Sequence, residues 1–228
     1  MVQENDEAVP AGQAHEAVRA GTAVVVDIRD SRQFDSGHPV GALNLPYSAR
    51  GLASRVSDLL AAAYGIGSPP VILIAGDEET AQAALEQLGD TESLSATVIT
   101  GGIAAWVDAG LPVETVEEID VGDLAPDVRA DNLITLDVRE PIEWEMGHVP
   151  GALLISLGEL GERVAEVPTD RPVAVISEAG VRSAMAASIL CVKGHGENLL
   201  HAVAGTAAYR GAGLPMEYAE AEIEDEDG

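Results

Sequence analysis

Apolar runs of strand length alternate with helix-type segments along both halves of the chain. In the first half, the strand-type runs occupy residues 22–27, 42–45, 71–74 and 97–100, and helix-type segments cover 13–20, 49–63, 81–88 and 101–110. In the second half, runs at 133–137 and 173–176 have the same strand character. Parallel strands need long crossover connections, which helices supply. The pattern therefore predicts an α/β fold in which a mainly parallel sheet carries helices on both faces.

The second half of the chain repeats the first. Residues 133–152 match 23–42 at an offset of 110 (137 − 27), and the Gly-Leu-Pro turn at 213–215 matches 110–112 at an offset of 103 (213 − 110). Two matching copies of roughly 100 residues indicate two domains of one fold. We place the domains at 10–117 and 118–216, with the boundary in the acidic stretch 114–120, an acidic lead at 1–9 and an acidic, disordered tail at 217–228.

The composition is that of a water-soluble globular protein. Hydrophobic residues make up 46% of the 228 positions and charged residues 22%. No apolar run approaches the ~20 residues of a membrane span, and the acidic, polar start does not resemble a secretory signal. A cytoplasmic location is therefore expected. Cys191 is the single cysteine, which excludes an internal disulfide and any multi-thiolate metal site, and we expect neither a metal nor a cofactor.

The charge is strongly negative. Asp and Glu number 39 against 12 Lys and Arg, a formal net charge of −27. Such a surface repels nucleic acid and anionic membranes. We therefore expect neither of them as a partner.

One loop of the second half has the features of an anion site. It follows the apolar run 173–176 and precedes a helix that we expect to begin at Ser183. Between a parallel strand and a helix N-terminus, successive backbone N–H groups and the helix dipole favour a bound anion. A thiolate at the first loop position would be stabilised and nucleophilic, whereas a serine hydroxyl stays protonated and weak. The candidate residues are Ser177, Glu178, Ala179, Gly180, Val181, Arg182 and Ser183.

Several spaced motifs resemble the rhodanese family of thiosulfate and 3-mercaptopyruvate sulfurtransferases. They are Asp-Val-Arg at 137–139, Gly-His-x-Pro-Gly-Ala at 147–152, Gly-x-Arg-Ser at 180–183 and Gly-Leu-Pro at 213–215. Because most of them have counterparts in the first half, the chain resembles a tandem rhodanese. The resemblance implies two doubly wound, mainly parallel five-stranded sheets. It also implies a loop cysteine that takes sulfur from a small anionic donor, becomes a persulfide and passes the sulfur to cyanide or a thiol.

The loop departs from the family pattern Cys-Arg-x-Gly-x-Arg at two positions. Ser177 stands at the nucleophilic cysteine position, and Glu178 stands where the family often has a cation. Because oxygen cannot form a persulfide, we predict that the chain with Ser177 does not transfer sulfur. The carboxylate of Glu178 is expected to weaken anion binding. Gly180 and Arg182 match the pattern.

The corresponding loop of the first half is degenerate. Its residues are Ile74, Ala75, Gly76, Asp77, Glu78 and Glu79. The resemblance places Ile74 at the nucleophile position and Glu79 at the arginine position. Three consecutive carboxylates suit a helix start but not an anion.

The remaining candidate residues are expected to be structural. The resemblance implies that Asp137, Arg139 and His148 stabilise the turn after their strand, as Asp27, Arg29 and His38 do in the first copy. Cys191 shares a helix face with two alanines and is expected to be a buried, inert thiol. We expect His195 and His201 on the surface or in loops, and we do not expect a serine–histidine hydrolase pair.

Two functions follow from these observations. In the first, the protein is a rhodanese-type sulfurtransferase, and Ser177 is an introduced replacement for cysteine. In the second, it is a natural, non-catalytic tandem rhodanese that acts as a binding or regulatory module and offers its acidic surface and tail to a protein partner. The sequence leaves both open.

Overall fold

The first half of the chain folds around a five-stranded parallel sheet. The computed structural model describes residues 8–65, 69–89 and 94–218, so residues 1–7 of the predicted lead and 219–228 of the predicted tail lie outside these ranges. The other residues of the lead form a strand, and Glu217 of the predicted tail pairs with His148. The strand order is β1-β6-β5-β2-β4, and every neighbouring pair is parallel. The strands are β1 (Ala8–Val9), β2 (Val24–Asp27), β4 (Leu43–Asn44), β5 (Val71–Ile74) and β6 (Ala96–Ile99).

The second half builds an equivalent parallel sheet, with the order β10-β9-β11-β12-β8. Its strands are β8 (Glu117–Ile119), β9 (Ile134–Asp137), β10 (Leu153–Leu154), β11 (Val173–Ile176) and β12 (Leu199–Ala202). The predicted α/β fold with two mainly parallel five-stranded sheets is therefore confirmed.

Helices cover both faces of the first sheet. Successive residues of a strand point to opposite faces, so Val24 and Val26 of β2 join one core cluster and Val25 joins another. The first cluster is covered by α3 (Leu52–Tyr64) and α4 (Glu78–Gly89), and the second by α1 (Ala11–Arg19) and α5 (Gly102–Asp108).

The second sheet is covered in the same way. On one face lie α6 (Val121–Arg129) and α10 (Gly205–Gly211), and on the other lie α8 (Leu160–Arg163) with the 3₁₀ turn η1 (Val164–Glu166) and α9 (Val181–Val192). Helix α9 begins two residues before the expected start at Ser183. The reason is that Gly180, with a φ of 88°, ends the loop in the left-handed conformation that glycine adopts readily.

Two short helices follow equivalent strands of the two sheets. These are α2 (Ser31–Ser36) after β2 and α7 (Pro141–Glu145) after β9. The side chain of Asp30 caps α2 by accepting a hydrogen bond from the backbone N–H of Gln33 at 2.9 Å. The capping box of Glu140 and Glu143 serves α7.

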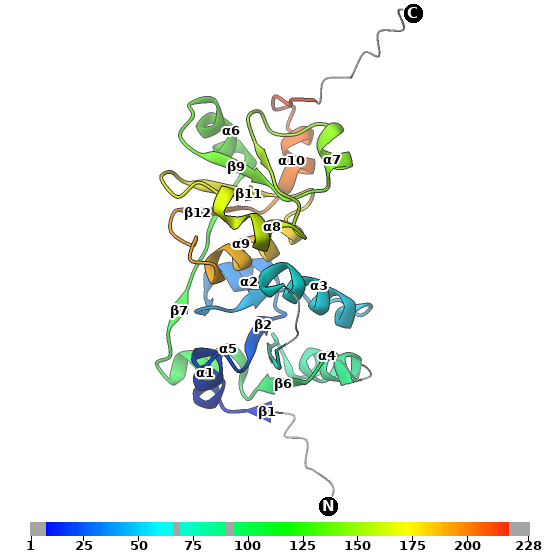
Figure 1. Ribbon diagram of the computed structural model, residues 1–228, viewed down its shortest axis with the longest axis vertical. Helices are drawn as coiled ribbons and strands as arrows, with labels where there is room; N and C mark the ends of the chain where they lie inside the picture. The colour runs from blue at the N-terminus through cyan, green and yellow to red at the C-terminus, as the bar shows by residue number, and fades with distance from the viewer. Residues whose placement is uncertain (1–7, 66–68, 90–93, 219–228) are drawn as a thin grey trace, which may run out of the picture.

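The two domains pack closely against each other. Figure 1 shows α2 and α3 of the first domain beside α8 and α9 of the second, and one core cluster contains residues from both domains. The predicted boundary stretch is itself structured, because β7 (Val113–Glu114) pairs with β3 (His38–Pro39) and β8 is an edge strand of the second sheet. Within the ranges that the structure describes, no helix is long and apolar enough to cross a membrane.

Candidate functional site

The candidate loop lies at the carboxyl end of β11, directly before α9. It is held by hydrogen bonds from the first turn of α10. The backbone N–H of Thr206 donates to the carbonyl of Ser177 at 2.8 Å, and that of Ala207 donates to the carbonyl of Glu178 at 3.0 Å. The carboxyl edge of a parallel sheet is where α/β folds usually bind ligands.

Ser177 is fully buried at the centre of this loop, with 0% of its side chain exposed. Its Oγ accepts a hydrogen bond from the backbone N–H of Ser183 at 3.1 Å and donates to the Ser183 Oγ at 3.2 Å. The γ atom of the side chain at position 177 therefore faces a backbone donor in the first turn of α9, where the helix dipole is positive.

The Glu178 carboxylate binds the hydrogen-bond donors that lie beside the loop. It accepts hydrogen bonds from Thr206 Oγ1 at 2.7 Å and Arg210 Nη2 at 2.8 Å, and Arg139 Nη1 lies 3.4 Å away. Burial acts to raise the pKa of Glu178, but the hydrogen bonds from Thr206 and Arg210 outweigh it, and the pKa lies below its ordinary value. The Glu178 carboxylate therefore binds the groups that could otherwise bind an external anion.

Arg182 is also paired within the protein. Its two terminal nitrogens donate to the two carboxylate oxygens of Glu143 on α7, each at 2.6 Å. These hydrogen bonds lower the pKa of Glu143 to about 2. The guanidinium that the family pattern predicts is therefore present at the loop but bound in a bidentate ion pair.

Removing the Glu143 carboxylate should make the free energy of unfolding less dependent on pH in the acid range. Because the folded pKa lies below the ordinary value of 4.5, the pair stabilises the fold above that value, and this stabilisation is lost as the pH falls through the folded pKa. The side chains are 31% and 28% exposed, so we expect a contribution of no more than about 1 kcal/mol. Urea unfolding at neutral and acid pH should show that Glu143→Gln loses less stability on acidification than the unaltered chain.

Glu145→Gln provides the control for that experiment. Glu145 lies on the same helix, and its replacement leaves the pair between Arg182 and Glu143 in place. Its acid loss should match that of the unaltered chain. Equal losses in the two variants would show that the ion pair does not contribute.

The turn residues occupy equivalent places in the two domains. Arg139 donates to both carboxylate oxygens of Asp137 and, at 2.9 Å, to the carbonyl of Gly147. His148 stacks on Trp144 with ring centroids 3.5 Å apart and bonds the Trp144 carbonyl through Nδ1 at 3.1 Å. In the first domain, Arg29 holds Asp27 and the Gly37 carbonyl, and His38 stacks on Phe34.

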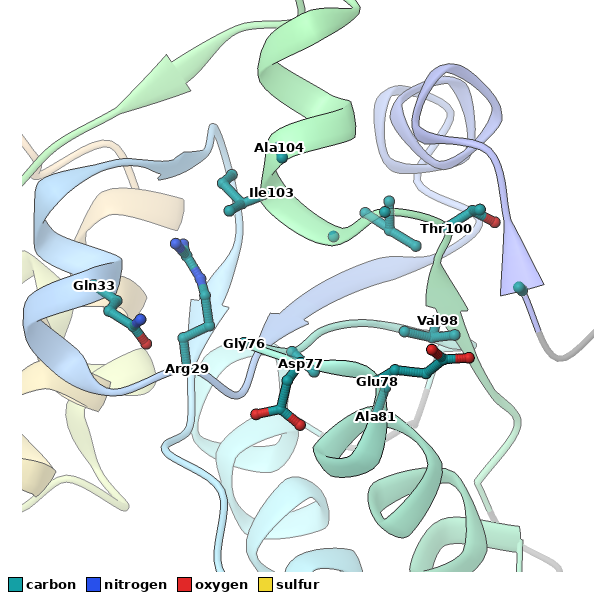
Figure 2. A pocket seen from close by; sticks show the side chains of 15 residues that line it. Arg29, Gln33, Gly76, Asp77, Glu78, Ala81, Val98, Thr100, Ile103 and Ala104 are labelled. Carbon is teal, nitrogen blue, oxygen red and sulfur yellow. The ribbon is translucent and has the colours of Figure 1, made fainter.

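The degenerate loop of the first domain lies beside an open cavity of about 610 Å³. Figure 2 shows Gln33 and Arg29 on the left of this cavity, Ile103 above the Arg29 side chain, and Asp77 and Glu78 to the right of Arg29. Asp77 caps α4 by accepting a hydrogen bond from the Thr80 N–H at 2.7 Å, which lowers the pKa of its carboxyl. Ile74, at the predicted nucleophile position, is buried in β5.

The internal repeat explains why this cavity is open. At the offset of 103, Ala75 corresponds to Glu178 and Ile103 to Thr206. Both Ala75 and Ile103 line the cavity, whereas Glu178 and Thr206 are hydrogen-bonded to each other. The space that the Glu178 network fills in the second domain is therefore unfilled in the first.

The prediction for His201 is wrong. This histidine is fully buried on β12, where Nδ1 lies 2.6 Å from Asp35 Oδ2 and Nε2 lies 3.0 Å from the Gly180 carbonyl. Its position within the apolar run 199–202 was a signal, because a polar residue in such a run needs buried partners. His195 lies in a loop and is half-buried.

Cys191 is half-buried rather than buried. Burial, together with the negative charges of Glu114 and Asp35, raises the pKa of its thiol to about 12. The thiol is therefore protonated and weakly nucleophilic near neutral pH. In the part of the chain that the structure describes, no group of three or more His, Cys, Asp or Glu side chains could hold a metal ion.

The rhodanese-like domain family matches the chain twice, at residues 10–109 and 120–211. A sulfurtransferase of Allochromatium vinosum is 31% identical over 102 residues, which cover 44% of this chain and 94% of the relative. A probable adenylyltransferase/sulfurtransferase MoeZ of Mycobacterium tuberculosis is 46% identical over 56 residues, 24% of this chain, and the match spans 14% of that protein. Among solved structures, thiosulfate sulfurtransferase from Pseudomonas aeruginosa aligns with a TM-score of 0.40 and 21% identity over 93% of this chain and 44% of that chain. Since the family match covers most of the sequence in two copies, this chain belongs to the rhodanese-like domain family.

Proposed function

We propose that the loop Ser177–Ser183 is a sulfurtransferase site that lacks its nucleophile, so that the chain with Ser177 does not transfer sulfur. One observation carries the proposal: the side-chain atom of residue 177 lies 3.1 Å from a backbone N–H in the first turn of α9. A thiolate at this atom would receive that hydrogen bond and the positive end of the helix dipole. The substrates would be a small anionic sulfur donor and a cyanide or thiol acceptor.

The chemistry shows why serine cannot substitute for cysteine. A thiolate would attack the outer sulfur of thiosulfate, the sulfur–sulfur bond would break, and sulfite would leave with the electron pair. Cyanide would then attack the outer sulfur of the persulfide, form thiocyanate and regenerate the thiolate. The hydroxyl of Ser177 stays protonated near neutral pH, and its oxygen cannot carry sulfur as a persulfide.

Glu178 forms a second obstacle to an anionic donor. Its carboxylate already accepts hydrogen bonds from Thr206 and Arg210 beside Arg139. A donor such as thiosulfate would have to displace this carboxylate in order to use the same groups. Restoring the thiol and removing the carboxylate should therefore have separate effects.

The test compares the chain as it stands with Ser177→Cys and with Ser177→Cys combined with Glu178→Ala. After incubation with thiosulfate, we expect no mass gain for the chain as it stands. We expect a gain of about one sulfur atom for Ser177→Cys and a faster gain for the double variant. Ile74→Cys is the matched control, because it places a thiol at the equivalent position beside Glu79 and should take up no sulfur.

Two outcomes would contradict the proposal. The first is thiocyanate production by the chain as it stands that is lost in Ser177→Ala. The second is the absence of a mass gain in Ser177→Cys and in the double variant, which would favour a non-catalytic binding or regulatory module.

One observation favours that second function. The cavity of about 610 Å³ in the first domain lies within the size range of small-molecule sites. It combines the Arg29 guanidinium and the Gln33 amide with the carboxylates of Asp77 and Glu78.

The codon for residue 177 in the source gene also separates the two functions. A cysteine codon would exclude a natural non-catalytic module, and a serine codon would exclude an introduced replacement.

A further inference from the structure

A line of buried hydrogen bonds joins the first domain to the candidate loop of the second. Asp35 Oδ2, on α2, lies 2.6 Å from His201 Nδ1; His201 Nε2 lies 3.1 Å from Ser183 Oγ; and Ser183 Oγ lies 3.2 Å from Ser177 Oγ. Asp35 is 3% exposed and the other three residues are 0% exposed. The line therefore crosses the domain boundary without contact with solvent.

The partners of His201 define its role. The Gly180 carbonyl, 3.0 Å from Nε2, can only accept a hydrogen bond, so Nε2 carries a hydrogen. Nδ1 and Asp35 Oδ2 share one hydrogen at 2.6 Å, so Asp35 fixes the orientation of the ring and keeps Nε2 a donor. An Nε2 that carries a hydrogen cannot remove a proton from Ser183, so this arrangement is not a serine hydrolase triad.

The orientation of His201 matters for residue 177. Its donor atom Nε2 faces the loop, and Asp35 lies on the opposite side of the ring. The other charged groups around the loop are paired with one another: Arg182 with Glu143, Arg139 with Asp137, and Arg210 with Glu178. Their charges offset, which leaves the hydrogen bonds of Ser183 and the dipole of α9 to act on position 177.

We infer that Asp35 is a positioning residue through which the first domain completes the sulfur site of the second. Asp35 orients His201, His201 holds the Gly180 carbonyl and Ser183 Oγ, and Ser183 donates its backbone N–H to the atom at position 177. An anionic sulfur at that position would be stabilised by the Ser183 N–H, which this line of hydrogen bonds holds in place. The inference rests on the proposed function for the identity of that atom.

The experiment measures the acidity of a thiol at position 177. The background is the full chain with Ser177→Cys and Cys191→Ser, so that residue 177 carries the single thiol. The ultraviolet absorbance of the thiolate is followed against pH, with the matching chain that retains Ser177 as the blank. In this background, Asp35→Asn should raise the thiol pKa by about one unit, which leaves about tenfold less thiolate below that pKa. Ser183→Ala should shift the pKa in the same direction.

Glu114→Gln is the matched control. Glu114 lies at the same domain junction and accepts a hydrogen bond from the Gly41 N–H at 2.9 Å, but it does not contact His201. In the Glu114→Gln variant, the thiol at position 177 should have the same pKa as in the background chain. Curves for Asp35→Asn and Ser183→Ala that coincide with the background would overturn the inference and leave Asp35 as an interface residue. If Asp35→Asn does not fold, Ser183→Ala alone decides.

The titration uses no sulfur donor, so the inference and the proposed function can fail separately. A thiol whose pKa depends on Asp35 but which takes no sulfur would contradict the proposed function and support the inference. A thiol that takes sulfur but titrates independently of Asp35 would do the reverse.

Discussion

Replacing Gly180 with alanine should destabilise the second domain by about 3 kcal/mol or more. Gly180 has a φ of 88°, and a Cβ added to it would lie 2.0 Å from the Val203 carbonyl oxygen. Such a contact is far inside van der Waals distance, and the obstructing atom belongs to the backbone after β12. The loop would have to move away from Val203, and the hydrogen bonds of Ser177 and His201 in this region would be lost. Urea unfolding followed by circular dichroism measures the loss.

Gly213→Ala separates the steric clash of the added Cβ from the strain of a positive φ. Gly213 also has a positive φ, 67°, but an added Cβ would meet no atom of the described residues within 4 Å. Its replacement should therefore cost only the strain of the left-handed backbone, about 1 kcal/mol. Equal losses for the two alanine variants would contradict the close approach of Gly180 to Val203.

The sequence could predict those elements that depend on local pattern. Strands β5 and β11 lie where the apolar runs 71–74 and 173–176 place them. Strand β1 has two residues and exists because Ala8 and Val9 pair with β6 about ninety positions away. Two residues carry no measurable periodicity, and a partner so distant leaves no local signal.

The same reasoning separates the predicted and unpredicted parts of the candidate site. The loop residues 177–183 are consecutive, and the internal repeat with the family motif identifies them. Their side-chain partners are distant: Glu143 is 39 positions from Arg182, Thr206 is 28 from Glu178, and Asp35 is 166 from His201. The negative composition could not show that acidic side chains neutralise the cations of the loop. That pairing depends on which elements the fold brings together.

Replacing Gly161 with alanine should loosen the packing between the two domains. A Cβ added at this position on α8 would lie 1.8 Å from the carbonyl oxygen of Ala62 on α3. No positive φ is involved, so the whole effect comes from separating the two helices. Overpacking of this kind typically costs about 1–3 kcal/mol. Here the contact is with backbone, which cannot rotate away, and we expect the upper end of that range.

The effect of Gly161→Ala should extend to the candidate site, because α9 and α8 share one core with α3. A displacement of α3 from α8 also moves Asp35 relative to His201. Thermal unfolding should change from one transition toward two as the domains separate, and limited proteolysis should cut the boundary stretch 114–120 faster. Gly158→Ala, three positions earlier, is the control, since an added Cβ there meets no described atom within 4 Å. If both variants unfold and are cleaved as the unaltered chain is, then the packing of α8 on α3 does not hold the domains together. The first domain then could not rely on this contact to present Asp35 to the candidate site.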